Sequence, residues 1–473
     1  METLLAIIAL PVLAASLSIF DGKPGPLRVL IVLLFWIQLF HLGNLFLPLI
    51  TGKQVLLPLM SGFAADRMGA LFALLSTLVV AASLTHAIVF FKNEISTSPL
   101  NEKIFFASSG LFLLAMTIVC ICDNIGYLWV GIEGTTLATA PLVYHFRDRH
   151  SLEATWKYLI ICSVGIAFAL LGTIFIYASS QHGEGSVGTL DLVTLIQSAK
   201  SLDYPFLRLG FIFCILGYGT KAGVFPLHSW LPDAHSEAPA PASAMLSGGL
   251  LNVALLAIWR LSTVVIASGH TALGLDLPLV MGVATVLAAS FFLVRQSGLK
   301  RLWAYSSIEN VGMMLCAIGL NAPYLFFLQA INHSLAKVAL FLLSGNIVQA
   351  TGTKHINDIK GVLSTSPSWA MLLICATFAV TGAPPFGAFI AEWYLLAQSS
   401  VAHLWWVVVV LAFALSLTFV VVCYHVGRCM FGAPHGHVRQ LNQFSGSLVP
   451  AVLLFLTLVV GSTSVAQYLV KMP

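Results

Sequence analysis

The stretch Gly217–Pro232, GYGTKAGVFPLHSWLP, continues the apolar run FLRLGFIFCIL of residues 206–216. A run of this length and composition predicts a transmembrane helix. It nevertheless carries Lys221 near its centre and Pro226 shortly afterwards. Proline removes a backbone donor and clashes with the preceding turn, so a helix opens at such a position. The stretch therefore predicts an interrupted span with a positive charge at the interruption.

The composition of the whole chain predicts a membrane protein. Of its 473 residues, 59% are hydrophobic and only 8% are charged, and the mean hydropathy is +0.95. A soluble protein usually has about 25% charged residues. Lipid admits only helices or closed barrels, and the apolar runs here are continuous instead of alternating. We therefore expect an all-α polytopic membrane protein. The net charge of +4 comes mostly from loops and does not indicate nucleic-acid binding.

Fourteen apolar runs are long enough for transmembrane helices. The first is not expected to be a signal peptide, because Met1-Glu2 offers no basic region and no convincing cleavage site follows. The runs cover approximately residues 4–20, 28–50, 69–91, 104–122, 125–144, 158–178, 206–227, 243–267, 277–294, 303–320, 324–348, 368–391, 402–427 and 449–470.

The distribution of basic residues predicts the orientation of these spans, because Lys and Arg accumulate in cytoplasmic loops. Loops after even-numbered spans hold only Lys53, Arg67, Lys200, Arg208 and Arg260, and Lys471 lies in the tail. The odd loops are therefore expected to be cytoplasmic and both termini to lie on the other side. The loops after odd-numbered spans hold Lys23, Arg28, Lys92, Lys103, Arg147, Arg149, Lys157, Arg295, Lys300, Arg301, Lys354, Lys360, Arg428 and Arg439.

Five charged residues are not assigned to loops: Lys221, Lys337, Glu133 and Glu309 lie inside predicted spans, and Glu392 closes the twelfth. A lone charge at this depth costs about 2.5–3.5 kcal/mol on insertion scales, so five are too costly to be incidental. One interpretation is that they pair as internal struts that fix helix register. The other is that they relay protons.

The energies of such groups are suited to a proton relay. Burial disfavours the charged forms of carboxylates and amines, and a nearby opposite charge restores them. At about 4 Å and an effective dielectric constant of 20, that attraction is about 4 kcal/mol. Moving one charge across 100 mV takes about 2.3 kcal/mol. Opening a Glu–Lys contact can therefore release a proton against a membrane potential. His333, four residues before Lys337 and on the same helical face, adds a titratable group.

A second span is interrupted at VTGAPPFGAF, residues 380–389, where two prolines stand between glycines. The two interruptions occupy the fourth position of spans 4–8 and of spans 9–13. Paired broken helices are typical of transporters built from inverted repeats, although two unrelated packing kinks are the alternative. The expected segments are an N-terminal three-helix part, two five-helix repeats and a C-terminal span, at residues 1–103, 104–267, 277–430 and 431–473.

The chain offers little for cofactor or metal binding. Its eight cysteines are scattered through apolar runs and are expected to be core residues, and Cys120 and Cys122 have no second cluster to complete a metal site. The loop Pro434–His437, PHGH, is expected to be solvated instead of metal-binding. No loop is long enough for a nucleotide, flavin or iron–sulfur domain; the longest covers about residues 179–205. We therefore expect no cofactor in this chain.

Five motifs resemble the antiporter-like, proton-translocating membrane subunits of respiratory complex I, Mrp antiporters and membrane-bound hydrogenases. The resemblance covers roughly residues 60–430, and the segments SSIEN and NHSLAK make it strongest toward the F component of the hydrogenase-4 and formate-hydrogenlyase type. The motifs are WVGIEGTTLATAPLVY (129–144), ATWKYLIICSVG (154–165), GTKAGVFPLHSWLPDAHSEAPAPASAMLSG (219–248), LKRLWAYSSIENVGMM (299–314) and INHSLAKVALFLLSGNI (331–347).

The resemblance implies roles for the buried charges. Lys221 matches the family's lysine in the broken seventh span, and Glu133 matches the glutamate that modulates it. His333 and Lys337 match the central-axis histidine and lysine. Glu392 falls where members carry lysine or glutamate at the end of the proton path.

Secondary candidates are Glu309, His228, Ser247 and Asn252. Family members commonly carry lysine or histidine in the eighth span, whereas this chain offers Ser243, Ser247 and Asn252, which do not titrate. Water held by Ser247 and Asn252 would relay a proton without storing one. The chain also ends soon after its last run, without the long lateral helix of one class of these proteins, which argues against the type found at the distal end of complex I.

The resemblance implies a proton-translocating subunit of a multisubunit redox-driven complex, hydrogenase-4-like or complex I-like, in a bacterial or archaeal cytoplasmic membrane. Nickel–iron or iron–sulfur centres are expected in a peripheral arm, and other small and antiporter-like membrane subunits as partners. An Mrp-type Na⁺/H⁺ antiporter subunit is the alternative. A scaffold that has lost transport is a third possibility, which the missing eighth-span base supports.

Overall fold

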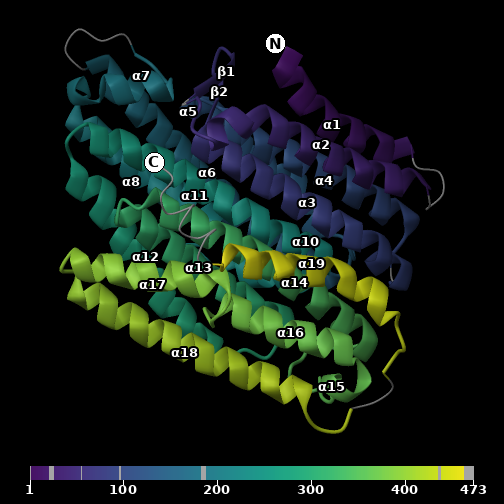
Figure 1. The fold of residues 1–473 in the computed structure, drawn as a ribbon. Helices are drawn as coiled ribbons and strands as arrows, with labels where there is room; N and C mark the ends of the chain where they lie inside the picture. The colour runs from purple at the N-terminus through teal and green to yellow at the C-terminus, as the bar shows by residue number, and fades with distance from the viewer. Residues whose placement is uncertain are drawn as a thin grey trace. The chain divides into compact units, whose positions relative to one another are not determined.

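A computed structural model describes residues 2–20, 26–54, 56–94, 97–182, 188–434 and 438–462. The chain divides into two compact units. Each is considered by itself, with elements labelled as in Figure 1. Unit 1 comprises residues 1–81, 98–230 and 249–278, and unit 2 comprises residues 82–97, 231–248 and 279–473.

The described residues of unit 1 form helices and one β-hairpin. Proline and capping side chains set several helix starts; the Asp203 carboxylate, for example, accepts from the Phe206 backbone N–H at the start of α8. The elements are α1 (Glu2–Phe20), α2 (Pro26–Ile50), β1 (Leu56–Met60), β2 (Phe63–Asp66), α4 (Pro99–Ile121), α5 (Ile125–Val143), α6 (Arg149–His182), α7 (Leu192–Gln197), a 3₁₀ turn (Ala199–Ser201), α8 (Tyr204–Ala222) and α11 (Leu251–Ala267).

Unit 2 is built around α14, which packs against α10, α13, α16, α17 and α19. Helices α3 (Arg67–Asn93), α9 (Trp230–Glu237) and α12 (Thr271–Leu293) contribute residues to both units. The other helices of unit 2 are α10 (Ala240–Met245), α13 (Leu299–Gly319), α14 (Pro323–Thr351), α15 (Val362–Thr365), α16 (Pro367–Val380), α17 (Gly387–Val401), α18 (Trp405–Met430) and α19 (Gln443–Val460).

The helices confirm a polytopic membrane protein. Nine helices of the described residues are long and apolar enough to cross a bilayer by length and composition, and two shorter apolar helices accompany them. Helices α5, α8 and α13 occupy the ranges of three further predicted spans, with 19, 19 and 21 residues. The total of fourteen spans stays a prediction.

Both helix interruptions lie where the sequence predicts them. Helix α8 ends at Ala222, and Gly223 continues with φ 81°, a left-handed conformation that glycine adopts without strain. The next helix, α9, begins at Trp230. In unit 2, α16 ends at Val380 and α17 begins at Gly387, on either side of the two prolines.

Glycines allow α6 and α8 to approach closely in unit 1. A Cβ atom on Gly217 would lie 2.5 Å from the Gly165 carbonyl oxygen, and one on Gly172 would lie 2.6 Å from the Gly210 carbonyl oxygen. Such spacing leaves no room for a larger residue. Small residues replace the hydrophobic effect as the basis of helix association in lipid, and here they hold the helix that carries Lys221 against α6.

Two local elements depart from a purely helical chain. Strands β1 and β2 form an antiparallel hairpin around Gly62, whose φ is 78°. The sequence does not predict this hairpin, because strands of five and four residues are too short to show a clear alternation of apolar and polar residues. The eighth predicted span also contains a π-helical turn, Leu246–Leu250, between α10 and α11. Such turns free a carbonyl from the usual helical ladder.

Some sequence-based expectations concern residues outside the described ones. These are the histidines of the PHGH loop, the end of the last apolar run, and the topology residues Lys23 and Lys471.

Candidate functional site

Lys221, in unit 1, is fully buried in the last turn of α8. Its Nζ atom donates to the Thr136 hydroxyl at 2.8 Å and to the Tyr158 hydroxyl at 2.6 Å. Nζ also lies 4.7 Å from the centroid of the Tyr158 ring. Position at a helix C-terminus favours a cation, because the helix dipole is negative there.

Glu133 reaches Lys221 through Thr136. The Thr136 hydroxyl donates to Glu133 Oε2 at 3.2 Å while accepting from Lys221. Among the described residues the glutamate and the lysine are therefore linked by one hydroxyl, not by a direct ion pair. Glu133 is half-buried on α5, so its carboxylate is less isolated than the lysine. We call Glu133, Thr136, Tyr158 and Lys221 the first cluster.

Hydroxyls extend the first cluster away from the lysine. Tyr158 accepts from Lys221 and lies 2.5 Å from the Thr139 hydroxyl, which in turn donates to the Thr135 carbonyl. At the interruption, the Trp230 Nε1 atom donates to the carbonyl oxygen of Thr220 at 2.8 Å. The open end of α8 is therefore supported by side chains, while Lys221 remains aimed at α5 and α6.

Lys337 lies on α14 in unit 2 and is fully buried. Its Nζ atom donates to the carbonyl oxygen of Trp303 at 3.0 Å. Ser307 donates to the same carbonyl at 2.9 Å, and its Oγ lies 2.8 Å from Ser247 Oγ. This shared carbonyl and two serine hydroxyls thus join the lysine to the π-helical turn.

His333 lies one turn before Lys337 and is also buried. Its Nε2 atom lies 3.2 Å from the carbonyl oxygen of Ser247 in the π-helical turn. A carbonyl only accepts, so Nε2 carries the hydrogen. Nδ1 has no hydrogen-bond partner among the described residues. We call Ser247, Ser307, His333 and Lys337 the second cluster.

The two other predicted glutamates are buried in unit 2. Glu309 Oε2 accepts from the Asn310 amide at 2.8 Å, and its charge interacts with that of Lys337. Glu392, on α17, packs against Gly382, where any Cβ atom would overlap the carboxylate. Gly382 has φ 66° in the α16–α17 interruption. A carboxylate therefore fills the space that the second broken helix leaves.

His235 is a buried titratable residue that sequence reasoning missed. It belongs to unit 2, is fully buried, and stacks on Phe341 with ring centroids 4.8 Å apart. Both ring nitrogens lack hydrogen-bond partners within the described part of the chain. The charges that act on it are those of Lys300 and Lys337. His235 comes just after the interruption, where the sequence looks like a loop, so its burial was not apparent.

The secondary candidates His228, Ser247 and Asn252 are divided between the two units. His228 is buried in unit 1 and packs on Phe225, with ring centroids 5.6 Å apart. Asn252 is buried in unit 1, whereas Ser247 belongs to unit 2. The expected water relay between Ser247 and Asn252 stays a prediction.

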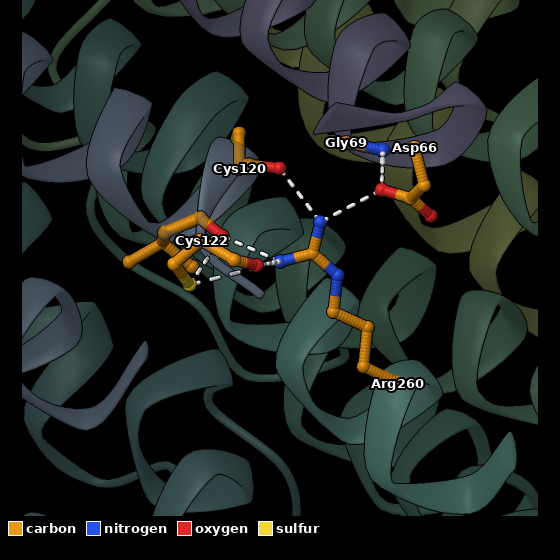
Figure 2. A network of polar contacts seen from close by, with 6 residues as sticks. Asp66, Gly69, Cys120, Cys122 and Arg260 are labelled. Carbon is orange, nitrogen blue, oxygen red and sulfur yellow. Dashed lines mark hydrogen bonds and ion pairs between the residues drawn. The ribbon is translucent and has the colours of Figure 1, made fainter. Parts of the chain in front are cut away.

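Arg260 was expected in a loop, and this assignment is wrong. It is buried on α11, where its guanidinium binds Asp66 Oδ1 at 2.8 Å. It also donates to the carbonyls of Val119 and Cys120 at 2.6 Å each and of Cys122 at 3.2 Å. Figure 2 shows this group enclosed by the end of α4 and by Asp66. One carboxylate and the carbonyls at a helix C-terminus compensate the charge through the two terminal nitrogens, whereas Nε has no hydrogen-bond partner among the described residues.

Apolar helices with two interruptions, and lysines and carboxylates buried beside these interruptions, define a multi-pass membrane protein. Its buried charges are of the kind that line ion pathways in other membrane proteins. Comparison with known proteins gives the particular family. Residues 122–418 match the family model described as "NADH:quinone oxidoreductase/Mrp antiporter, TM". The chain belongs to this family, as an antiporter-like membrane subunit.

The similar proteins come from different complexes. A hydrogenase-4 component F homolog of Methylacidiphilum infernorum is 38% identical over 72% of this chain and 73% of its own length. The fold matches a chain of an archaeal membrane-bound sulfane sulfur reductase with a TM-score of 0.86 and 22% identity, covering 99% of this chain and 96% of that one. A chain of the Mrp complex from Dietzia sp. DQ12-45-1b matches with a TM-score of 0.87 and 18% identity, covering 99% and 95%.

Proposed function

We propose that this chain is a proton-translocating subunit of a redox-driven membrane complex of the hydrogenase-4, formate-hydrogenlyase or complex I type. The observation that carries the proposal is the first cluster: a fully buried lysine at the end of an interrupted helix, linked through one hydroxyl to a glutamate. The 38% identity to a hydrogenase-4 component F homolog supports the redox-driven type.

The first cluster is suited to gate a proton. Thr136 donates its hydroxyl hydrogen to Glu133 and accepts from Lys221 at the same oxygen, so its hydroxyl couples the two groups. Rotation of that hydroxyl weakens the link and favours the neutral lysine, because an isolated buried ammonium is costly. Glu133 thereby controls how firmly Lys221 holds its proton.

The second cluster, with Glu309 and Glu392, provides further proton-binding groups. His333 contacts the Ser247 carbonyl oxygen, which belongs to the π-helical turn. Lys337 contacts the Trp303 carbonyl oxygen, which the Ser307 hydroxyl connects to the same turn. We add His235 to this group because its ring is buried near charged residues without hydrogen-bond partners among the described residues. His228, Ser247 and Asn252 are proposed as water-assisted secondary positions.

The complex would divide its chemistry among subunits. Redox chemistry belongs to a peripheral arm that carries nickel–iron or iron–sulfur centres, while this chain and other antiporter-like and small membrane subunits move ions. Within the described residues, no group of three or more His, Cys, Asp or Glu side chains is arranged to hold a metal ion.

The proposal includes the finer architecture expected from the sequence. Fourteen spans form two inverted five-helix repeats, residues 104–267 and 277–430, between residues 1–103 and 431–473. The chain lies in a bacterial or archaeal cytoplasmic membrane, and both termini face away from the cytoplasm. Accessibility labelling of single cysteines near either terminus in intact cells tests this topology.

A second candidate is a Na⁺/H⁺ antiporter subunit of Mrp type. The similarity of the fold to a chain of the Mrp complex and the wording of the family model favour it. Mild-detergent purification of the full chain separates the two candidates. Co-purification of a nickel–iron hydrogenase pair supports the first candidate, and small antiporter subunits instead support the second.

Lys221→Ala in the assembled complex tests the transport role. We expect the complex to assemble and its redox reaction to continue, while proton uptake into inverted vesicles is abolished. A Lys200→Ala variant, at an exposed position in the same unit, serves as the control. Unchanged proton uptake by Lys221→Ala contradicts the assignment and leaves the scaffold as the remaining function.

A further inference from the structure

The connection from α5 to α6 in unit 1 combines positive charge with hollows that the proposed transport path does not use. A hollow of about 310 Å³ is lined by Ile104, Ala140 and Pro141 and by the side chains of Tyr144 and Arg147. Polar residues of the connection, of α4 (Asn101) and of α6 (Thr155) line it beside these apolar groups. Such a hollow fits hydrocarbon beside a charged or polar headgroup.

A second hollow, of about 520 Å³, runs along the first turns of α6. It is lined by Arg149 and Trp156, by Lys157 and Glu153, which form an ion pair at 2.7 Å, and by the apolar Leu152, Ile160 and Ile161. Tryptophan and basic residues at the end of an apolar helix are typical of the level of lipid headgroups. The same few turns of chain thus line both hollows.

An exposed apolar face continues from this second hollow along α6. Trp156, Ile160, Val164 and Phe168 follow one another at four-residue spacing and are 57%, 58%, 54% and 44% exposed. Residues four apart lie on one helical face, so they form a continuous strip. The strip has the length and chemistry to accommodate an acyl chain.

The charges at the start of the strip are available for an anion. Arg147 and Arg149 are exposed, and neither takes part in an ion pair between described residues. Arg147 has φ 54°, a left-handed conformation that is uncommon outside glycine. The carboxylate between them is occupied, because Asp148 Oδ1 accepts from the Ser151 N–H at 2.6 Å.

We propose that the α5–α6 connection binds a diacyl phospholipid with an anionic headgroup. The headgroup phosphate contacts Arg147 and Arg149, which offer the planar donors that phosphate prefers. One acyl chain lies along the α6 strip, and the other enters the hollow lined by Ala140. The connection is expected on the cytoplasmic side, where anionic lipids favour basic residues.

Native mass spectrometry of the full chain tests this site. The chain is purified in mild detergent and given equal amounts of dioleoyl phosphatidylglycerol and dioleoyl phosphatidylcholine. We expect phosphatidylglycerol to be retained preferentially, by about fivefold for each arginine. Arg147→Gln/Arg149→Gln should lose this preference, and Ala140→Leu should lower total phospholipid retention.

The control is Lys200→Gln/Arg208→Gln, which removes the same charge from exposed positions elsewhere in unit 1 and should keep the preference. Glycerol 3-phosphate, which supplies the phosphate without acyl chains, should not displace the lipid. Equal retention of the two lipids by the unaltered chain overturns the proposal. The proposal is also overturned if the preference survives in Arg147→Gln/Arg149→Gln or is lost equally in Lys200→Gln/Arg208→Gln. Loss of the preference on addition of glycerol 3-phosphate overturns it as well. Unchanged thermal midpoints of all variants ensure that each result concerns folded protein.

Discussion

At the scale of single residues, the most informative group is the Thr136 hydroxyl. It is the only described atom that hydrogen-bonds both Glu133 and Lys221, and its single proton allows one donation at a time. A serine preserves this hydroxyl, whereas valine preserves the shape and removes it. The residue therefore separates hydrogen bonding from packing.

Thr136→Val should lower proton transport at least tenfold while leaving the redox reaction of the complex running. One hydrogen bond to a charged group contributes about 1.5–3 kcal/mol, which is roughly one to two orders of magnitude in an equilibrium constant. The measurement is the initial rate of proton uptake into inverted vesicles. Thr136→Ser should keep most of the rate. Equal loss in both variants would indicate a packing role.

A second prediction at this scale concerns Asp123, in the connection between α4 and α5. Burial, together with the nearby Asp191 carboxylate, raises the pKa of Asp123 to about 6. The unfolded chain has an aspartate pKa of about 3.9. Folding therefore favours the protonated form, and stability should fall as the pH rises from about 4 through 6.

Asp123→Asn removes this titration. The thermal midpoint of the purified variant should exceed that of the unaltered chain at pH 7.5, and the difference should close as the pH approaches 4. Glu153→Gln, at an exposed position on α6, is the control and should show no such convergence. A constant difference between Asp123→Asn and the unaltered chain across this range would refute the assignment.

At the scale of secondary-structure elements, Arg260 joins three parts of unit 1. Its guanidinium connects α11 to the C-terminal carbonyls of α4 and to Asp66 at the end of β2 (Figure 2). Asp66 also accepts from the Gly69 backbone N–H at 3.0 Å, so it caps the start of α3. The arginine thus fixes helix ends that lipid cannot solvate.

Arg260→Met should strongly destabilise the protein. Removing one partner of a buried ion pair costs about 3–5 kcal/mol. The carbonyls at the end of α4 would stay buried without their donor, although the Asp66 side chain is 32% exposed. The measurement is the thermal midpoint of the purified protein. Lys354→Met is a matched control, since its ion pair with Glu237 is 46% exposed on the lysine side and is expected to contribute less than about 1 kcal/mol. Similar midpoints for the two variants would disprove the structural role of Arg260.

Comparison of the elements with the sequence shows which features of the fold the sequence predicts. Length and apolar composition predicted the helical class, and prolines predicted both interruptions, because these features act locally. The burial of Arg260 could not be predicted, because the groups that compensate its charge are distant in sequence. They are backbone carbonyls and Asp66, which lie more than a hundred residues earlier in the chain. His235 was missed for the same reason: neighbours distant in sequence bury it. The residue composition of Leu246–Leu250 does not predict a π-helical turn.

At the scale of the whole molecule, two lysines of the described residues have no exposed surface, Lys221 in unit 1 and Lys337 in unit 2. The proposed function makes both lysines members of one proton path. The alternative is two paths that operate independently, one in each unit. These two arrangements differ in how the loss of one lysine combines with the loss of the other, because effects on one sequential process are not additive.

The combination of Lys221→Ala and Lys337→Ala decides between these arrangements. On one path, each single variant should abolish proton uptake, and the double variant should lose no more than either single one. On two independent paths, each single variant should keep about half of the rate, and only the double variant should lose all of it. The measurement is proton uptake per electron transferred in inverted vesicles, since this ratio corrects for differences in complex assembly. Lys221→Arg and Lys337→Arg keep the charge but hold their protons at all accessible pH values, so both should be as inactive as alanine. Activity in the arginine variants would mean that the charge of these residues matters and their proton does not.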